Sequence, residues 1–204
     1  MIKEKDSKPL LPQHVAVIMD GNGRWAQRNG KSRIEGHRSG VKNVRQIVEC
    51  AREMGIPNLT LYAFSVENWK RPKAEVSALM ALLNTFLKRE LSNMMKNDVR
   101  LNVIGRIAEL PTNVRKNLQD TMDKTAKNSN LLLSLALNYG ARTELLDAVT
   151  SYISQNDVNN CGELEWSTFS KHLYTREMPD PDLIIRTSGE HRLSNFLLMQ
   201  GAYA

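Results

Sequence analysis

The chain has 204 residues, 41% of them hydrophobic, which is enough for one domain with a sizeable apolar core. Its 28 Lys and Arg residues outnumber its 22 Asp and Glu residues, and the formal charge of +6 suggests an anionic partner. Nucleic acid, a phosphorylated metabolite and a membrane surface all qualify, but no apolar run approaches the roughly 18 residues of a membrane-spanning helix.

The first residues, MIKEKDSKPLLPQ, are charged and then bounded by proline, without the apolar segment of a signal peptide. Cys50 and Cys161 lie far apart and form no C-x-x-C pair, which argues against a disulfide framework and against a zinc site. We therefore expect a reduced, cytoplasmic setting.

Apolar runs predict five strands, and apolar residues at helical spacing predict helices between them. In chain order we expect a strand at 14–20, a helix over 41–54, a strand at 59–65, a helix over 72–95, a strand at 100–105, a helix over 111–127, a strand at 131–140, helices near 144–154 and 167–173, a short strand at 181–186 and a helix-like tail over 194–204. The polar stretch 155–165 is the best candidate for a long surface loop.

The alternation of strands and helices defines the expected fold class. The strands are apolar throughout rather than alternating, which is typical of a mostly parallel central sheet covered on both faces by helices. The sequence has no internal repeat and no recognisable domain boundary. We expect a single α/β domain over residues 1–204.

The segment MDGNGRW follows the first expected strand. Ligands of open parallel sheets bind at the carboxyl edge, where Asp20, Ser65 and Arg186 each end an expected strand. After Asp20, the glycines Gly21 and Gly23 permit close backbone approach, and a helix behind them offers free N–H groups to an anion.

Three explanations of GNGRW compete. A P-loop fails because the glycine that it needs five positions before Gly30 is Trp25. The dinucleotide fingerprint G-x-G-x-x-A matches from Gly21 to Ala26, but no acid ends a second strand about 20 residues later. In the third explanation, Asp20 binds Mg²⁺, which bridges to a diphosphate held by the glycine-rich backbone. A structural Asx-type turn stays open as the alternative.

Two further segments leave expected strands with polar side chains. AFSVENWKRP (63–72) brings Ser, Glu, Asn, Trp and Arg into one short loop, and RTSGEHRLS (186–194) contains two arginines, two serines and a glycine. Guanidinium forks and hydroxyls suit phosphate oxygens, although a capped surface turn would explain the second segment too. His37 and Arg33 are ambiguous, and we interpret His14 and His172 as structural.

These segments together resemble a known family. MDGNGRW, YAFSVENWKRP and RTSGEHRLSNFLL, with GHRSG and LNYGAR between them, are similar to the cis-prenyltransferases, the Z-type isoprenyl diphosphate synthases that include undecaprenyl diphosphate synthase. The likeness runs in order from about residue 12 to the end. It implies a Mg²⁺-dependent enzyme that extends farnesyl diphosphate with isopentenyl diphosphate units, forming cis double bonds, to give the lipid carrier of bacterial wall synthesis.

The resemblance also implies roles for individual residues. Asp20 corresponds to the family's Mg²⁺-linked aspartate, and Asn68 to the residue that accepts or relays the condensation proton. The positions that it implies for substrate binding are Gly21, Asn22, Gly23, Arg24, Trp25, Arg33 and His37 around the allylic diphosphate, Ser65, Val66, Glu67, Trp69 and Arg71 in the substrate-contacting loop, and Arg186, Arg192, Leu193 and Ser194 at the isopentenyl diphosphate.

One departure from the family pattern concerns the end of the chain. In the family, an acid that helps to bind Mg²⁺ follows the apolar tail in a pattern like A-Y-x-E-L-Y-F, and this sequence ends at Ala204, just before it. We therefore expect the family's last strand to be missing, with consequences for metal affinity and for a dimer interface near the C-terminus.

Two other functions stay open. A dinucleotide-dependent oxidoreductase would use the Gly21–Ala26 match, but lacks the ribose-binding acid. A non-catalytic basic module could bind RNA or anionic lipid, although few residues are aromatic (6%) and no basic stripe along one helix is recognisable. As a prenyltransferase the chain is expected to bind no nucleic acid, to form a homodimer and to contact a membrane peripherally during product release.

Overall fold

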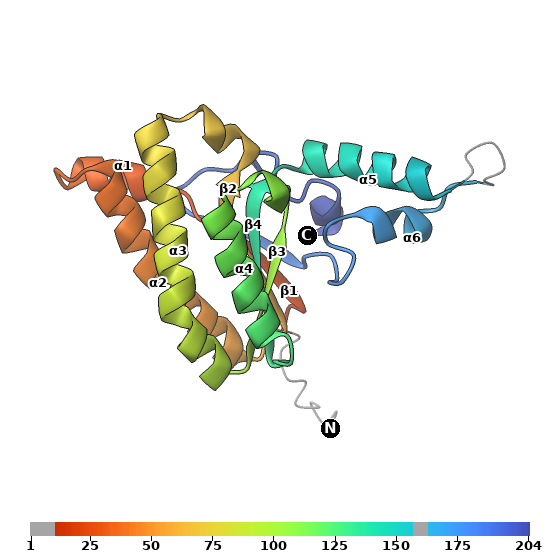
Figure 1. Ribbon diagram of the computed structural model, residues 1–204, viewed down its shortest axis with the longest axis horizontal. Coiled ribbons are helices and arrows are strands. Elements are labelled where there is room, and N and C mark those ends of the chain that lie inside the picture. The colour runs from red at the N-terminus through yellow and green to blue at the C-terminus, as the bar shows by residue number, and fades with distance from the viewer. Residues whose placement is uncertain (1–10, 157–162) are drawn as a thin grey trace, which may run out of the picture.

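The computed structural model describes residues 11–156 and 163–204 and contains a five-stranded sheet in the order β3-β4-β2-β1-β5, with every pairing parallel (Figure 1). The strands are β1 (His14–Ile18), β2 (Asn58–Ser65), β3 (Val99–Ile104), β4 (Leu131–Tyr139) and β5 (Leu183–Arg186). The expected parallel α/β fold is confirmed. The charged N-terminal segment up to residue 10, Cys161 and most of the loop expected at 155–165 lie outside the described residues.

The burial of the strands follows their place in the sheet. Every residue of β1 is buried, as is nearly every residue of β4, because both strands lie between neighbours and both sheet faces are covered. β5 pairs only with β1, and there Leu183 and Ile185 are 44% and 42% exposed. β5 is therefore apolar in sequence but only partly buried, because it lies at one edge of the described sheet.

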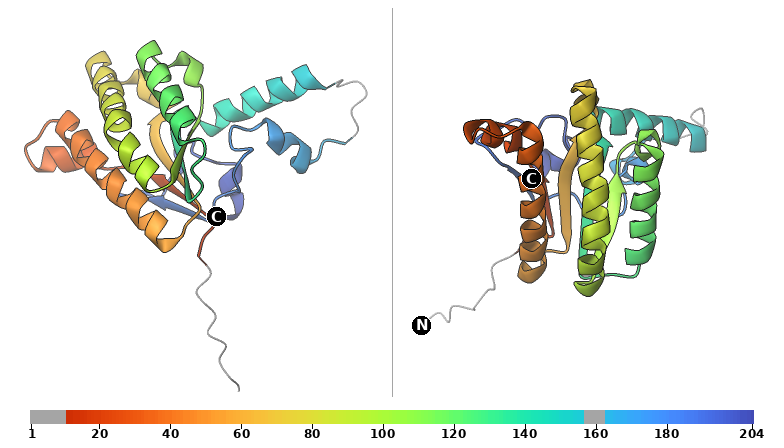
Figure 2. Two further views of the ribbon diagram at one scale, coloured as in Figure 1. Left: turned by 60° about the horizontal axis from the view of Figure 1, so that its bottom comes forward. Right: turned by 60° about the vertical axis from the view of Figure 1, so that its left-hand side comes forward.

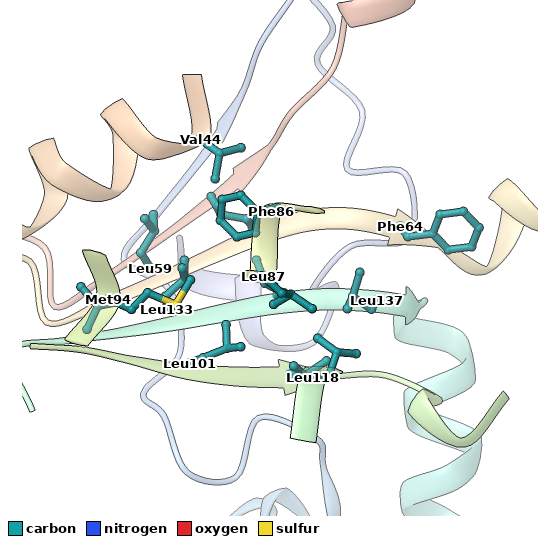
Figure 3. Close-up of a cluster of buried hydrophobic side chains, with 14 of the residues drawn as sticks. Val44, Leu59, Phe64, Phe86, Leu87, Met94, Leu101, Leu118, Leu133 and Leu137 are labelled. Atoms are coloured by element: carbon teal, nitrogen blue, oxygen red, sulfur yellow. The ribbon is translucent and has the colours of Figure 1, made fainter. Parts of the chain in front are cut away.

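Three long helices cover one face of the sheet. α2 (Arg33–Met54), α3 (Lys73–Lys96) and α4 (Thr112–Thr125) lie side by side over this face (Figures 1 and 2). The main core forms between them and the strands, as Figure 3 shows for Phe86 and Leu87 of α3 and Leu133 of β4. The expected bounds of α3 and α4 agree with the structure to within two residues.

The N-terminal part of α2 was missed by the periodicity of apolar residues. The helix begins at Arg33, eight residues before the expected start at Val41, because Ser32 and Glu35 form a capping box. The Ser32 side chain accepts the Glu35 N–H at 3.3 Å, and the Glu35 carboxylate accepts the Ser32 N–H at 2.8 Å. A second helix that was not expected as such, α1 (Asn22–Arg28), precedes this cap.

The other face of the sheet is covered mainly by irregular chain. Tyr62 and Tyr139 of the sheet contact Phe196, which stacks on Tyr62 with ring centroids 4.4 Å apart. The expected helix-like tail is wrong for most of its length: Ser194, Asn195 and Leu197 have positive φ, and only a 3₁₀ turn at Gln200–Tyr203 is helical.

Two further helical segments follow β4 in the chain. α5 (Ala141–Gln155) projects beyond the sheet (Figure 1), and the helix expected at 167–173 is split into α6 (Trp166–Phe169) and a 3₁₀ turn at Ser170–His172. No helix within residues 11–156 and 163–204 is both long and apolar enough to cross a membrane.

His14 has a structural role, as its sequence context suggested. Its ring is 1% exposed, with Nδ1 2.7 Å from the Pro179 carbonyl oxygen and Nε2 2.7 Å from Thr60 Oγ1, so the neutral ring satisfies both partners. Burial lowers the pKa of His14 below its ordinary 6.5, although the Pro179 hydrogen bond and nearby carboxylates oppose this.

This environment predicts a pH dependence of stability. In the unfolded chain His14 takes up a proton below about pH 6.5, whereas the folded ring resists it, so the free energy of unfolding falls as the pH drops below that value by up to ~1.4 kcal/mol per unit. Urea titrations across this range measure the slope. His14→Gln makes the slope shallower without removing it, because burial also lowers the pKa of His37. Equal slopes in wild type and His14→Gln would contradict the assignment.

Candidate active site

The carboxyl edge of the sheet brings together residues from three strands. Asp20 follows β1, and Ser65 and Arg186 are the last residues of β2 and β5, which are the two neighbours of β1. Arg186 Nη2 lies 2.8 Å from Asp20 Oδ2, and all three residues line one cavity. The expectation that these strand ends share one edge is confirmed.

Asp20 is held in its ionised form by three donors. The Gly21 N–H donates to Oδ1 at 2.6 Å, and Arg186 and Arg24 donate to Oδ2 at 2.8 and 3.2 Å. Partial burial raises the pKa of Asp20, but these hydrogen bonds and the two positive charges outweigh it and hold the pKa below its usual value. The carboxylate is therefore charged at neutral pH.

The bend after Asp20 consists of one residue. Gly21 has φ 98°, and a Cβ at this position would lie 1.7 Å from Ser188 Oγ, so only glycine fits. Ser188 and Thr187 close the bend by donating their hydroxyls to the Asp20 carbonyl oxygen at 3.0 and 2.6 Å. Asn22, Gly23 and Arg24 form the first turn of α1, so the helix expected behind the glycines already begins between Gly21 and Gly23.

A chain of alternating charges crosses the site. Arg24 donates to Glu190 at 2.7 Å, Glu190 also pairs with Arg192, and Arg186 donates to Ser194 Oγ at 2.7 Å and to the Arg192 carbonyl oxygen. The arginines expected at the two diphosphates thus surround one small region. Glu190 was missed as a site residue, although an acid four positions from one arginine and two from another was readable in RTSGEHR.

The loop after β2 is a 3₁₀ helix, η1 (Val66–Lys70). The side chain of Asn68 accepts the Ser65 N–H at 3.2 Å and so caps the loop, while Glu67 accepts from Asn195 at 3.0 Å. Asn195 was another residue missed, because its left-handed backbone and its reach across the edge are not visible in sequence.

His37 lies at the side of the same region. Its Nε2 is 3.5 Å from Glu75 Oε1, and Arg71 donates to the same Glu75 oxygen at 2.8 Å. Burial and the positive charge of Arg71 lower the pKa of His37, which Glu75 offsets only in part. The neutral imidazole is favoured at pH 7.

A cavity of about 840 Å³ extends from these polar residues between the sheet and helices α2 and α3. Its inner wall is apolar, with Val44 and Ile47 of α2, Leu79 and Leu83 of α3 and Leu135 of β4 among its residues. The charged and polar lining lies at the carboxyl edge of the strands. The site is therefore a polar entrance to an apolar compartment.

The structure divides the residues expected in the site into two groups. Those that line the cavity are Asp20, Asn22, His37, Ser65, Glu67, Asn68, Arg71, Arg186, Arg192 and Ser194. Those outside its lining are Gly21, Gly23, Arg24, Trp25, Arg33, Val66, Trp69 and Leu193. Gly21 and Arg24 still contact Asp20 directly, whereas Trp25 is 43% exposed with Lys31 Nζ 5.1 Å from its ring centroid.

Trp69 fixes the η1 loop to the end of β4. Its Nε1–H donates to Asn138 Oδ1 at 2.7 Å, and its ring meets Phe64 edge-on at 5.0 Å. Asn138 is 1% exposed and also donates to the Arg106 carbonyl oxygen and to Glu109. Buried Asn138 thus holds the η1 loop in place through Trp69. This role could not be predicted from the sequence LNYGAR.

Trp69→Phe tests this anchoring. The change keeps the ring but leaves the buried Asn138 oxygen without its donor, so we expect a loss of ~1–3 kcal/mol in the free energy of unfolding with little change in substrate KM. Urea denaturation and steady-state kinetics measure both, and Trp166→Phe, at a 45% exposed indole, is the control. A raised KM with unchanged stability would instead indicate direct substrate contact.

Comparisons with known proteins agree with this architecture. Residues 18–204 match the family described as "Putative undecaprenyl diphosphate synthase". An isoprenyl transferase of Geobacter sulfurreducens is 51% identical over 195 residues, covering 95% of this chain and 79% of the relative. A Shewanella oneidensis protein named ditrans,polycis-undecaprenyl-diphosphate synthase ((2E,6E)-farnesyl-diphosphate specific) is 48% identical, covering 97% of this chain and 72% of the relative.

The fold is shared with a solved prenyl diphosphate synthase. The crystal structure of lavandulyl diphosphate synthase from Lavandula x intermedia, in complex with dimethylallyl diphosphate, superposes with a TM-score of 0.89 at 33% identity. The match covers 93% of this chain and 83% of that one.

Proposed function

Because the chain belongs to the undecaprenyl diphosphate synthase family and is a prenyltransferase, we propose that it condenses isopentenyl diphosphate units onto farnesyl diphosphate to make a long-chain polyprenyl diphosphate. The observation that carries this proposal is that a charged, polar edge of the sheet adjoins an apolar cavity. A polar edge containing Asp20, Arg186 and Arg192 opens into an apolar cavity of about 840 Å³. Such a site suits a substrate with an anionic head and a hydrocarbon tail.

The residues at the edge fit a magnesium ion brought by the substrate. Mg²⁺ is commonly bound through one or two carboxylates and substrate phosphates rather than by an all-protein cage. Among the described residues no three His, Cys, Asp or Glu side chains gather as a complete metal site, so the protein would supply Asp20 and the diphosphate the remaining oxygens. A carboxylate accepts up to about four bonds, so Asp20 retains capacity beside its three donors.

The chemistry assigns a task to each part of the edge. When the allylic C–O bond breaks, the diphosphate leaves with the electron pair, and the double bond of isopentenyl diphosphate forms the new C–C bond before a proton is lost. Bound Mg²⁺ supplies charge stabilisation to the leaving group. The Gly21–Arg24 turn holds this diphosphate, with Trp25, Arg33 and His37 nearby.

The second diphosphate stays attached to its substrate and needs only to be held. Arg186, Arg192 and Ser194 provide guanidinium and hydroxyl donors for it, and Leu193 lies between two of them in sequence. Ser65, Val66, Glu67 and Arg71 lie in the loop over the reacting ends, and Trp69 holds this loop in place through its hydrogen bond to Asn138. Asn68, which lines the cavity at this point, accepts or relays the proton.

The apolar cavity is proposed to hold the growing hydrocarbon. Leu83→Trp adds bulk to its α3 wall, so we expect shorter products, measured by chromatography of the labelled lipid, with a stability cost of ~1–3 kcal/mol. The matched control is Met95→Trp on the same helix, because Met95 is 48% exposed and lies outside the cavity lining. An unchanged product distribution in Leu83→Trp would contradict this use of the cavity.

We further propose that two copies associate through α5. Leu146, Val149 and Ile153 recur at helical spacing and are 66%, 39% and 54% exposed on the projecting helix (Figure 1). An exposed apolar stripe of this kind is suited to burial against a second copy. Sedimentation tests the homodimer: wild type should sediment as a dimer and Leu146→Glu as a monomer. We also propose a cytoplasmic setting.

The direct test of the activity is incubation with farnesyl diphosphate, labelled isopentenyl diphosphate and Mg²⁺. Label extracted into long-chain lipid, and lost when Mg²⁺ is chelated, supports the proposal. No incorporation by folded protein would refute it.

A further inference from the structure

The positive charge of the chain is concentrated in one pair of helices. Residues 24–45 contain seven Lys and Arg residues and a single acid, Glu35, so this stretch carries a formal +6. The whole chain also carries +6, so the remainder is neutral overall. The charge excess therefore belongs to α1, the turn that follows it and the first half of α2.

Five residues of this stretch are exposed, and we call them together the α1–α2 basic face: Trp25, Arg28, Lys31, Arg38 and Lys42. Arg28 follows Trp25 by one turn of α1, and Lys31 lies over the Trp25 ring at 5.1 Å. Lys31 and Arg38 both act on Glu35, whose pKa is lowered first by its Ser32 hydrogen bonds and then by these two charges.

The α1–α2 basic face continues along α2. Lys42 follows Arg38 by four residues and so lies on the same side of the helix. No basic stripe was recognisable in sequence because the expected helix began at Val41, which left Arg38 outside it. Within residues 11–156 and 163–204, none of the four basic residues of the face has a carboxylate within 4.0 Å, unlike Arg24, which pairs with Asp20 and Glu190, and Arg45, which pairs with Glu49.

The helices that carry the face pack closely together and lie beside the cavity. Gly36 and Gly40 let α1 approach α2 closely, since a Cβ at either would come within 2.6 Å of Asn22. Asn22 of α1 and His37, Gly40 and Val41 of α2 line the cavity, so the same two helices carry the cavity wall and the charges. α1 and α2 lie at the end of the molecule opposite α5 and α6 (Figure 1), so association through α5 leaves the face free.

We propose that the α1–α2 basic face docks this protein on the surface of an anionic lipid bilayer. Unpaired Lys and Arg side chains near such a surface are attracted to its headgroups, and an exposed tryptophan is suited to the headgroup level. The role of this docking rests on the proposed function. A product with an anionic head and a long hydrocarbon would leave the apolar cavity next to the membrane that receives it.

The test is co-sedimentation of the full chain with vesicles of phosphatidylcholine and phosphatidylglycerol, and with vesicles of phosphatidylcholine alone. We expect binding to the anionic vesicles only, weakened by added salt. The variant Arg28→Gln/Lys31→Gln/Arg38→Gln/Lys42→Gln should lose roughly fivefold in partitioning per charge, equivalent to about 1 kcal/mol each, or several-hundred-fold in all at low ionic strength.

The matched control is Arg115→Gln/Lys116→Gln/Lys124→Gln/Lys127→Gln, four exposed cations on and directly after α4. Both variants remove four positive charges from the same chain, so their net charges are equal, and the control should keep most of the vesicle binding. Equal losses in the two variants would overturn the proposal, because net charge alone would then explain the attraction.

Two further readouts separate the remaining outcomes. Binding of a mixed-sequence DNA duplex that exceeds vesicle binding, and that only the α1–α2 variant loses, would also overturn the proposal in favour of a nucleic-acid surface. Turnover is measured with detergent and without vesicles, where both variants should stay within about twofold of wild type. Absence of turnover in wild type would count against the proposed function. Vesicle binding is measured independently of turnover, so it tests the docking proposal separately.

Discussion

Asp20→Asn is expected to lower kcat/KM for chain elongation by about three orders of magnitude, roughly 4 kcal/mol of transition-state stabilisation. The amide keeps the size of the side chain and can still accept the Gly21 N–H that now lies 2.6 Å from Oδ1. It loses the charge that is proposed to attract Mg²⁺ to the diphosphate. Kinetics over a range of Mg²⁺ concentrations measure the effect, and the loss should lessen as Mg²⁺ is raised.

The control for this variant is Asp120→Asn, at an exposed carboxylate on α4. It should retain wild-type turnover and the same Mg²⁺ dependence. If Asp20→Asn kept kcat/KM within about threefold of wild type, the carboxylate would have no part in stabilising the leaving group. Because the pKa of Asp20 is held below its usual value, the carboxylate is already ionised at neutral pH. Raising the pH above neutral should therefore neither increase the activity of wild type through Asp20 nor restore the activity of Asp20→Asn.

Arg186→Lys is expected to reduce kcat/KM by about a hundredfold, close to 2.7 kcal/mol, although it preserves the charge. Arg186 joins Asp20 at 2.8 Å and Ser194 at 2.7 Å through different nitrogens of one planar fork, and its side chain is only 10% exposed. A lysine ammonium is a single point charge and cannot hold both partners in the same positions. The loss should appear mainly as a raised KM for isopentenyl diphosphate.

Two comparisons make this prediction specific. Arg192→Lys should cost less, because the Arg192 side chain is 63% exposed and, among the residues that the structure describes, its charge pairs only with Glu190. Arg176→Lys, at an exposed residue away from the site, should behave as wild type. Wild-type kinetics in Arg186→Lys would show that charge and not fork geometry matters at the end of β5.

Much of the framework could be predicted because it depends on local patterns. The apolar runs of β1 and β4 have no polar face to expose, so they had to be interior strands of a covered parallel sheet. From that alone, Asp20, Ser65 and Arg186 were expected at one edge, since parallel strands all end on the same side. The start of α2 is also encoded locally, because Ser32 and Glu35 match the capping-box pattern, whereas the apolar spacing begins only at Val41.

Other features depend on contacts between segments that are far apart in sequence. The Trp69 indole donates to Asn138, and Glu190 bridges Arg24 and Arg192, because β1, β2, β4 and β5 all end at the same edge of the sheet. The left-handed backbone at Ser194, Asn195 and Leu197 places Phe196 on Tyr62, and helical propensity in the tail could not reveal that packing.

The amino-acid sequence by itself thus determined the strand framework, the acid after β1 and the family to which the chain belongs, since each is written in contiguous residues. Only the tertiary structure decided that Val44, Leu83 and Leu135 enclose a cavity instead of a filled core, and that Arg28, Lys31, Arg38 and Lys42 share one exposed surface. The physical reason is that cavities and surfaces depend on how helices pack against a sheet, and apolar side chains read the same in either arrangement.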